Sequence, residues 1–262
     1  MMASARLRFF AELNDLLSCD HPEREICYEF SVAPSVKDIM ENLGVPHTEV
    51  SLIVVNGGPV DFTYRPVDGD RVSVYPAFTR VDLPSAGRLR RDLGDDIRFV
   101  VDGHLGALAR YLRLIGFDTA FDPNWSDREL AGFGVERVLL TRDRGLLKRR
   151  AVIYGAFVRD NAPDEQLVEV VRRFHLSDRL RPFTRCMACN GDLEDVDKSE
   201  VADRVGPRTG AQFDRFRRCQ GCGRVYWQGS HWGRLLALVE RARSAETEPS
   251  LATTAVGARS ST

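Results

Sequence analysis

Two C-x2-C pairs constrain this chain more than any other feature of its sequence. Cys186 and Cys189 form the first pair, Cys219 and Cys222 form the second, and 29 residues separate them. Four thiolates at this spacing can meet tetrahedrally around Zn²⁺, as in zinc ribbons. A redox role for one pair is the alternative, but neither pair opens a helix of a βαβ unit as a thioredoxin-type motif does. The pattern predicts a structural zinc whose four sulfur ligands leave no position for water.

Basic and aromatic residues interleave around these cysteines. Such a mixture can hold single-stranded nucleic acid by charge and stacking. The alternative is that the aromatic residues form the small core of the zinc module. We expect RNA contacts from two arginines and two ring-bearing residues of this section: Arg185, Arg218, Trp227 and His231.

Length and composition indicate a folded chain. The 262 residues are 43% hydrophobic, which is enough apolar material to bury cores in two or three small domains. No run approaches the roughly 18 apolar residues of a membrane span, and Arg6, Arg8 and Glu12 interrupt the start as a secretory leader would not. We therefore expect a soluble, cytoplasmic protein with no membrane partner.

The net charge of −1 hides an acidic front and a basic back. Residues 1–82 carry 7 Lys and Arg against 13 Asp and Glu, whereas residues 83–262 carry 30 against 25. Of the 37 basic residues 34 are Arg, a preference that fits phosphate recognition by guanidinium groups. Genomic codon bias is the alternative explanation.

The acidic front predicts a small α+β domain over residues 1–82. Its apolar patterns predict strands at 5–10, 26–31, 52–55 and 72–75, and a helix at 36–43 that ends before Gly44. Strands wrapped around one helix favour a ubiquitin-like β-grasp domain. Residues 83–96 mix Pro, Gly and charge without an apolar period, so they are expected to be a linker.

The basic back alternates between strand and helix patterns, which predicts a parallel α/β sheet over residues 97–181. Strands are expected at 97–101, 137–141 and 152–158. Helices are expected at 105–115, ending at Gly116, and after Pro163. The zinc ribbon with a trailing helix is expected over 182–243, and residues 244–262 have little to bury and are expected to be a disordered tail.

Acidic residues follow the predicted strands of this sheet. Asp102, Asp143 and Asp160 each come at or just after a strand's end, where an open parallel sheet places its ligand crevice. Convergent carboxylates suit Mg²⁺ or Mn²⁺, which can activate water for phosphodiester hydrolysis. Helix capping is the alternative role of each Asp. Asp127 follows Ser126, which forms a capping box with Glu129, so a place in the first helical turn competes with catalysis there.

Arginines near these acids could position a polyanion. Arg110 and Arg113 are predicted on the polar side of the helix after Asp102, and Arg142 and Arg144 flank Asp143. Such clusters neutralise phosphates without selecting a sequence. A solvated helix face is the alternative.

Several long motifs together resemble a known family. The segments FVVDGHLGALARYLRLIGFD, VLLTRDRGLLKR, RCMACN and CQGCGRVYWQGSH resemble the Mut-7 carboxy-terminal RNase family (Mut-7-C), a PIN-like nuclease domain fused to a zinc ribbon. The front section is similar to the ubiquitin-like domain that often precedes it. The resemblance implies an α/β PIN-like fold with an acidic site that binds Mg²⁺ or Mn²⁺ and cleaves RNA, single-stranded or tRNA-like.

The resemblance carries over to single residues. Asp102 and Asp143 match the family's first and third acids, and Asp160 is the expected fourth. Asp127 matches less fully, because Ser126 stands where a second acid often sits. These matches predict a metal-dependent ribonuclease with Asp102, Asp127, Asp143 and Asp160 as its catalytic acids.

Two other functions stay open at this point. The chain could be a non-catalytic adaptor that holds RNA or a ribonucleoprotein. The β-grasp domain could also dock a protein partner, in which case deleting residues 1–82 is expected to leave the isolated nuclease intact. Its chain continues into the next domain, so it offers no terminal Gly-Gly carboxylate for sulfur transfer.

Overall fold

The computed structural model describes residues 2–18, 25–76, 89 and 96–246. They form two compact units, which we describe separately. The first holds residues 1–112 and 117–159, and the second holds residues 113–116 and 160–262, as far as these are described. Among the described residues, no helix combines the length and the apolar character that crossing a lipid bilayer requires.

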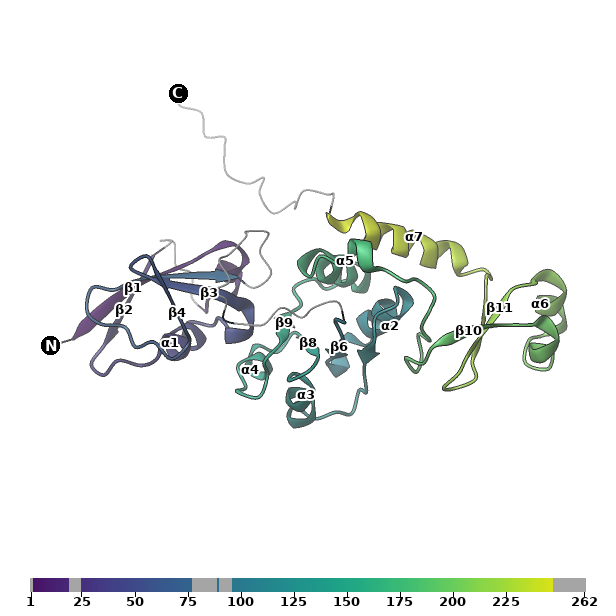
Figure 1. Ribbon diagram of the computed structural model, residues 1–262, viewed down its shortest axis with the longest axis horizontal. Coiled ribbons are helices and arrows are strands. Elements are labelled where there is room, and N and C mark those ends of the chain that lie inside the picture. The colour runs from purple at the N-terminus through teal and green to yellow at the C-terminus, as the bar shows by residue number, and fades with distance from the viewer. Residues whose placement is uncertain (1, 19–24, 77–88, 90–95, 247–262) are drawn as a thin grey trace, which may run out of the picture. The chain divides into compact units, whose positions relative to one another are not determined.

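The first unit begins with the predicted ubiquitin-like sheet, of which Figure 1 labels β1 to β4. Its strand order is β2-β1-β5-β3-β4. β1 pairs in parallel with β5, and the other neighbours are antiparallel. Its elements are β1 (Ala3–Phe9), η1 (Ala11–Leu16), β2 (Ile26–Phe30), α1 (Val36–Asn42), η2 (His47–Glu49), β3 (Val50–Val55), β4 (Gly58–Val60) and β5 (Arg71–Pro76).

Local sequence explains why α1 forms where it does. Ser35 caps it through a reciprocal capping box with Asp38, and Ile39 and Met40 face the core at 0% exposure. Gly44 follows with a φ of +106°, a backbone conformation that glycine adopts without a steric penalty. The helix predicted at 36–43 is therefore confirmed.

The second sheet of this unit is parallel throughout, in the order β7-β6-β8-β9, which confirms the predicted α/β class. Apolar side chains of α3 and α4 form one core cluster with β6 and β8, including Leu130, Leu146 and Val100. The elements are β6 (Phe99–Val101), η4 (Gly103–Leu105), α2 (Gly106–Leu114), β7 (Thr119–Ala120), α3 (Asp127–Phe133), β8 (Val138–Thr141), α4 (Arg144–Leu147) and β9 (Gly155–Phe157).

The second unit contains a long helix pair and a three-stranded antiparallel sheet in the order β10-β11-β12. α5 and α7 contact one another, and Val201, Val205 and Phe216 form a small core beside the sheet. The elements are α5 (Pro163–Arg173), η5 (Ser177–Arg179), β10 (Leu193–Val196), η6 (Lys198–Val201), α6 (Pro207–Gln212), β11 (Phe216–Cys219), β12 (Val225–Trp227), α7 (Trp232–Arg243) and η7 (Ser244–Glu246).

Two of the segment predictions differ from the structure in part. The strand predicted at 152–158 is shorter and spans Gly155–Phe157, because the chain bends at Ile153 and Tyr154, whose N–H groups donate to the carbonyl of Gly134. The predicted tail begins with an ordered turn, η7, in which Ala245 is buried; the rest of the tail and most of the predicted linker lie outside the described residues.

Candidate functional site

Asp102 and Asp143 lie at the carboxyl ends of β6 and β8, which are neighbouring parallel strands. The buried Thr141 connects them: its hydroxyl donates to Oδ2 of Asp102 at 2.6 Å and accepts from the backbone N–H of Asp143 at 3.0 Å. Thr141 is not among the residues that the sequence patterns indicated. Its position two residues before Asp143, at the strand's end, is the pattern that could have indicated it.

Each of these two carboxylates keeps one oxygen without a hydrogen bond to a described residue. Oδ2 of Asp102 is used by Thr141, and Oδ1 of Asp143 accepts from the N–H groups of Gly145 and Leu146 as the cap of α4. Two carboxylate oxygens at one sheet edge suit Mg²⁺ or Mn²⁺, because these ions prefer oxygen ligands and keep several waters. The alternative role of helix capping is confirmed for Asp143, because its Oδ1 caps α4. Capping does not use its Oδ2, which could hold a metal.

Asp127 is placed differently. It is the first residue of α3 and lies between Ser126 and Glu129, which form the capping box that the sequence predicts. Its Oδ2 lies 2.7 Å from Nη2 of the exposed Arg149. Asp127 does not form a group with Asp102 and Asp143 in which all ligand oxygens lie within 4.8 Å. Its carboxylate is held in a surface ion pair.

Asp160 belongs to the second unit. Its backbone N–H donates to Oε2 of Glu169 at 3.1 Å, and its carbonyl accepts from Nε2 of Gln166 at 2.9 Å. Glu169 is an acid beside Asp160 that no sequence pattern indicated. Asp122, two residues after β7, is another strand-end acid that was not predicted, although the same rule that selected Asp102 applies to it.

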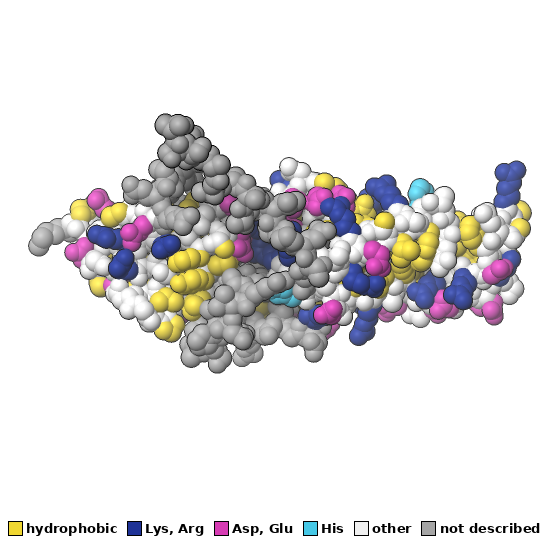
Figure 2. Space-filling model, turned by 90° about the horizontal axis from the view of Figure 1, so that it is seen from above, with side chains coloured by type: hydrophobic (Ala, Val, Ile, Leu, Met, Phe, Trp, Pro, Cys, Tyr) yellow, Lys and Arg dark blue, Asp and Glu magenta, His cyan; other side chains and the backbone are white. Residues whose placement is uncertain are grey.

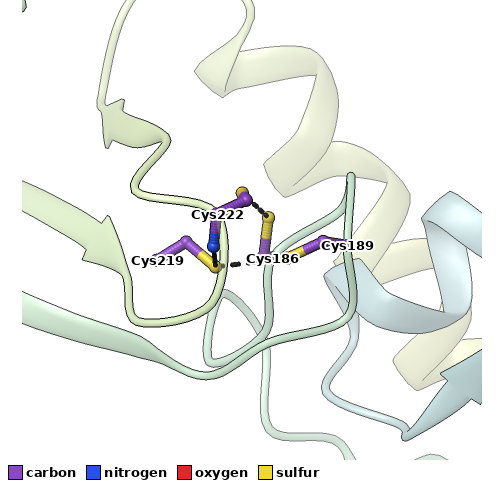
Figure 3. A group of neighbouring side chains, drawn as sticks. All are labelled: Cys186, Cys189, Cys219 and Cys222. Carbon is purple, nitrogen blue, oxygen red and sulfur yellow. Dashed lines mark hydrogen bonds between the residues drawn. The ribbon is translucent and has the colours of Figure 1, made fainter.

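The four predicted zinc ligands meet in the second unit. Cys186 and Cys189 come from the loop before β10, Cys219 is the last residue of β11, and Cys222 lies in the turn after it; all four side chains point toward one another (Figure 3). Their sulfur atoms all lie within 4.8 Å, with 3.7 Å between Cys186 and Cys222 and 3.3 Å between Cys189 and Cys219. Tetrahedral Zn–S bonds of about 2.3 Å place sulfurs roughly 3.8 Å apart, so the group fits zinc.

The surroundings of Cys186 favour its thiolate. Burial by itself raises the pKa of this thiol, but hydrogen bonds from the hydroxyl of Tyr226, at 3.0 Å, and from the N–H groups of Ala188 and Cys189 outweigh burial and lower the pKa to about 6. Burial raises the pKa of Cys219, the opposite direction. Since zinc binds thiolates, the Tyr226 hydroxyl supports the ligand form of Cys186.

The prediction that Arg113 lies on a polar helix side is wrong. Arg113 is 4% exposed, and its Nη1 donates to the carbonyls of Ala188, at 2.7 Å, and of Met187, at 3.3 Å. These carbonyls belong to the loop between Cys186 and Cys189, so the guanidinium supports the first cysteine pair. The helical pattern gave a polar position, but packing against this loop buries it.

We expect Arg113→Ala to destabilise the second unit by about 2–4 kcal/mol, because two carbonyls lose a charged donor inside the protein. Zinc affinity should fall with it. Arg110→Ala is the matched control: it is an exposed arginine one turn earlier on α2 and should change stability by less than about 0.5 kcal/mol. Equal unfolding curves and equal zinc affinities for the two variants would contradict this role.

The other three arginines predicted near the acids differ in their exposure and in their hydrogen-bond partners. Arg110 is exposed and has no ion-pair or hydrogen-bond partner among the described residues. Arg142 is exposed and donates to the carbonyl of Arg159 at 3.2 Å. Arg144 is half-buried: its Nη1 donates to the carbonyl of Leu16 at 3.0 Å, and its guanidinium lies over the ring of Phe157. Arg144 therefore connects the parallel sheet to the ubiquitin-like domain.

Of the four ribbon residues predicted to contact RNA, the two arginines are paired with other protein groups and the two ring-bearing side chains are exposed. Arg185 donates to the carbonyl of Asn190, and Arg218 forms ion pairs with Glu194 and Glu200. Trp227 is 40% exposed, and His231 is exposed at the N-terminal end of α7. The ring of Trp227 and the imidazole of His231 are the more accessible of the four.

Buried polar residues tie the ubiquitin-like domain to the edge strand β9 within the first unit. Glu49 is 0% exposed, and its Oε1 accepts from the backbone N–H of Phe157 at 2.7 Å while Oε2 lies 3.6 Å from Nη2 of Arg159. His47 bridges Glu41 and the carbonyl of Val152 at 2.7 and 3.0 Å. Deleting residues 1–82 would remove the Glu49 carboxylate from this network, and the expectation that the isolated nuclease stays intact after the deletion stays a prediction.

We therefore expect Glu49→Ala to lower the free energy of unfolding of the first unit by about 3–5 kcal/mol, the typical cost of removing one partner of a buried charge pair. Glu29→Ala, which removes an exposed carboxylate from β2 of the same domain, should cost less than about 0.5 kcal/mol. Urea unfolding of the full chain measures both. A Glu49 variant as stable as the Glu29 variant would show that the domains fold independently.

Comparisons with known proteins match both parts of the chain. The family described as the Mut7-C RNAse domain matches residues 97–239, and the one described as Mut7-C ubiquitin matches residues 2–82. No curated protein matches.

Solved structures from Haloferax volcanii resemble part of the chain. The solution structure of the HVO 2177 protein is 21% identical, with 30% of this chain and 88% of that chain covered and a TM-score of 0.25. Two crystal structures of small archaeal modifier protein 1 (SAMP1) are 16% and 15% identical. They cover 28% and 31% of this chain and 97% and 100% of their own, with TM-scores of 0.23 and 0.24.

The motifs, the parallel sheet and the cysteine group agree with the first of these family matches, which spans more than half of the residues. The chain belongs to the Mut7-C RNase domain family, with a Mut7-C ubiquitin domain ahead of its RNase domain.

Proposed function

We propose that this chain is a metal-dependent ribonuclease whose divalent ion is held by Asp102 and Asp143. The observation that carries the proposal is the pair of carboxylates at the ends of β6 and β8, each with one oxygen left over, joined through Thr141. Mg²⁺ or Mn²⁺ bound there would supply a Lewis acid for phosphodiester hydrolysis. Asp127 and Asp160 stay predictions from the sequence.

The chain's own residues would position the reacting groups. Thr141 fixes Oδ2 of Asp102, and the N–H groups at the start of α4 fix Oδ1 of Asp143, so the two remaining oxygens have defined directions. Carboxylates held by such hydrogen bonds need little reorganisation when they bind a cation. Arg110, exposed and without a described partner, would contact the phosphate backbone of RNA without selecting its sequence.

We further propose that the four cysteines hold a structural zinc and that the ribbon assists RNA binding through Arg185, Arg218, Trp227 and His231. Arg142 would contribute beside Arg110, whereas Arg113 and Arg144 are engaged inside the protein. The acidic ubiquitin-like domain would bind a protein partner. Thiolate zinc ligands need a reducing compartment, which favours a cytoplasmic location.

End-labelled single-stranded RNA and a folded tRNA, incubated with Mn²⁺, Mg²⁺ or EDTA, test the proposal. We expect the wild type to cut with a divalent ion and to stop in EDTA, and the Asp102→Asn/Asp143→Asn double variant to cut in neither condition. Equal RNA binding by both proteins with no cleavage under any metal would overturn the enzyme. The non-catalytic RNA-binding adaptor would then be the better description.

A further inference from the structure

A cavity of about 270 Å³ lies in the second unit between the ribbon and the start of α7. Its lining combines four aromatic rings with three arginines: Phe183, Tyr226, Trp227, Trp232, Arg185, Arg215 and Arg217. Figure 2 shows dark blue Lys and Arg side chains beside yellow hydrophobic ones in the region that carries α7. None of the residues that line the cavity belongs to the acidic pair, and two of them, Arg185 and Trp227, are among the ribbon residues proposed above to bind RNA.

One wall of the cavity is held in an unusual backbone conformation. Phe183 has a φ of +61°, which bulky residues rarely adopt, and its ring stacks on Trp232 with centroids 4.2 Å apart. Its N–H donates to the carbonyl of Leu114 at 2.8 Å, and its own carbonyl accepts from Nη1 of Arg217 at 2.7 Å. Two anchors thus hold a flat aromatic wall in place at the expense of local strain.

The lining holds one carboxylate, that of Asp195, against three arginines, so its net charge is positive and is partly unpaired. Arg217 is neutralised by Asp195, with Nε 2.9 Å from the carboxylate, and Arg185 lies 3.6 Å from the exposed Asp192. Arg215 is exposed and has no ion-pair or hydrogen-bond partner among the described residues. An anionic group beside the cavity would therefore find a free guanidinium.

We propose that this cavity takes the base of one unpaired RNA nucleotide, with its phosphate on Arg215. Aromatic side chains stack bases of single-stranded RNA, and the exposed Trp227 offers such a face next to the stacked Phe183 and Trp232. The inference rests on the proposed function, because it assumes that RNA is the substrate. It adds that the ribbon selects an unpaired nucleotide.

The size of the cavity argues for one base. Drug-sized ligands occupy pockets of about 300–1,000 Å³, and this volume lies just below that range. A base within a duplex is stacked on both faces and cannot enter without unpairing. A free mononucleotide carries the same base and phosphate, so it is the second possible source of the ligand.

Binding to the full-length, zinc-loaded protein tests the site. The probes are a fluorescein-labelled unpaired 12-nucleotide RNA, the same sequence as a duplex, and AMP. Trp227→Leu removes a stacking face, Arg215→Ala removes the phosphate contact, and Arg208→Ala is the control, an exposed arginine of α6 outside the cavity lining. EDTA is omitted from the zinc-loaded samples, and assays without Mg²⁺ or Mn²⁺ prevent cleavage.

We expect Trp227→Leu to raise the dissociation constant for the unpaired RNA roughly 5- to 100-fold, the worth of one stacked base. Arg215→Ala should raise it about threefold or more, the control should stay within twofold of wild type, and the duplex should bind more weakly. Ultraviolet crosslinking of 4-thiouridine RNA should mark the peptide containing Tyr226 and Trp227. If AMP binding also depends on Trp227 and has a lower dissociation constant than binding of the unpaired RNA, the ligand of the cavity is a free nucleotide and not RNA.

Binding of unpaired RNA within twofold of wild type by both cavity variants would overturn the inference, even where metal-dependent cleavage is intact. A wild type that does not bind RNA would overturn it as well. A wild type that binds RNA through Trp227 but never cuts it would instead overturn the ribonuclease and leave the cavity's role standing.

Discussion

Replacing Cys186 with serine is expected to abolish zinc binding and unfold the ribbon between about residues 184 and 228. Structural zinc contributes about 10–16 kcal/mol of apparent binding free energy in small zinc domains, and that energy is folding energy. The described core of this module consists of Val201, Val205 and Phe216, which is little apolar burial for a module of this length. Without the metal, the antiparallel sheet β10-β11-β12 should lose its protection from proteases.

Zinc release and limited proteolysis measure this loss. Cys27→Ser is the control, because Cys27 is an exposed, free cysteine on β2 outside the cysteine group. It should keep its zinc and its protease resistance. A Cys186 variant that retains one zinc per chain and an intact ribbon would show that the metal is not held by these four sulfurs.

The features that the sequence predicted correctly depend on neighbours along the chain. The capping box of Ser126 and Glu129 and the positive φ angles of Gly44 and Gly116 after their helices are features of the local backbone. The cysteine group is also predictable, because its C-x2-C spacing is a ligand geometry written directly into the sequence.

What the sequence could not indicate is set by contacts between distant segments. Arg113 has the periodicity of a polar position, yet a loop more than 70 residues later covers it. The sequence around Glu49 does not predict that its carboxylate is completely buried. The group that donates to it, the N–H of Phe157, lies 108 residues away in the chain. Charged side chains of this kind are placed by tertiary structure, which no hydrophobic period encodes.

The acidic site falls between these cases. The rule that ligands bind at the carboxyl ends of parallel strands selected Asp102 and Asp143, and the adjacent strands β6 and β8 bring them to one edge. The same rule does not say which oxygen of each carboxylate is already used. That depends on Thr141 and on the start of α4.

Asp102→Asn is expected to reduce metal-dependent RNA cleavage by about 10²–10³-fold or more. It removes one charged oxygen ligand of the divalent ion that would stabilise the negative charge developing on the phosphate. The amide keeps an oxygen that can accept from Thr141, so the fold should be retained. Asp143→Asn should act in the same way, since asparagine is also a good cap for α4.

Asp127→Asn separates the two-carboxylate site from a larger acidic cluster. It makes the same chemical change, but it breaks an ion pair with Arg149 whose side chains are half-exposed, which is worth less than about 1 kcal/mol. Cleavage should stay within about threefold of wild type if Asp102 and Asp143 suffice. Thermal unfolding of all three variants checks that the fold is unchanged. A loss with Asp127→Asn as large as that with Asp102→Asn would mean that the cation recruits Asp127 out of its ion pair. The metal site would then form fully only when the ion is bound.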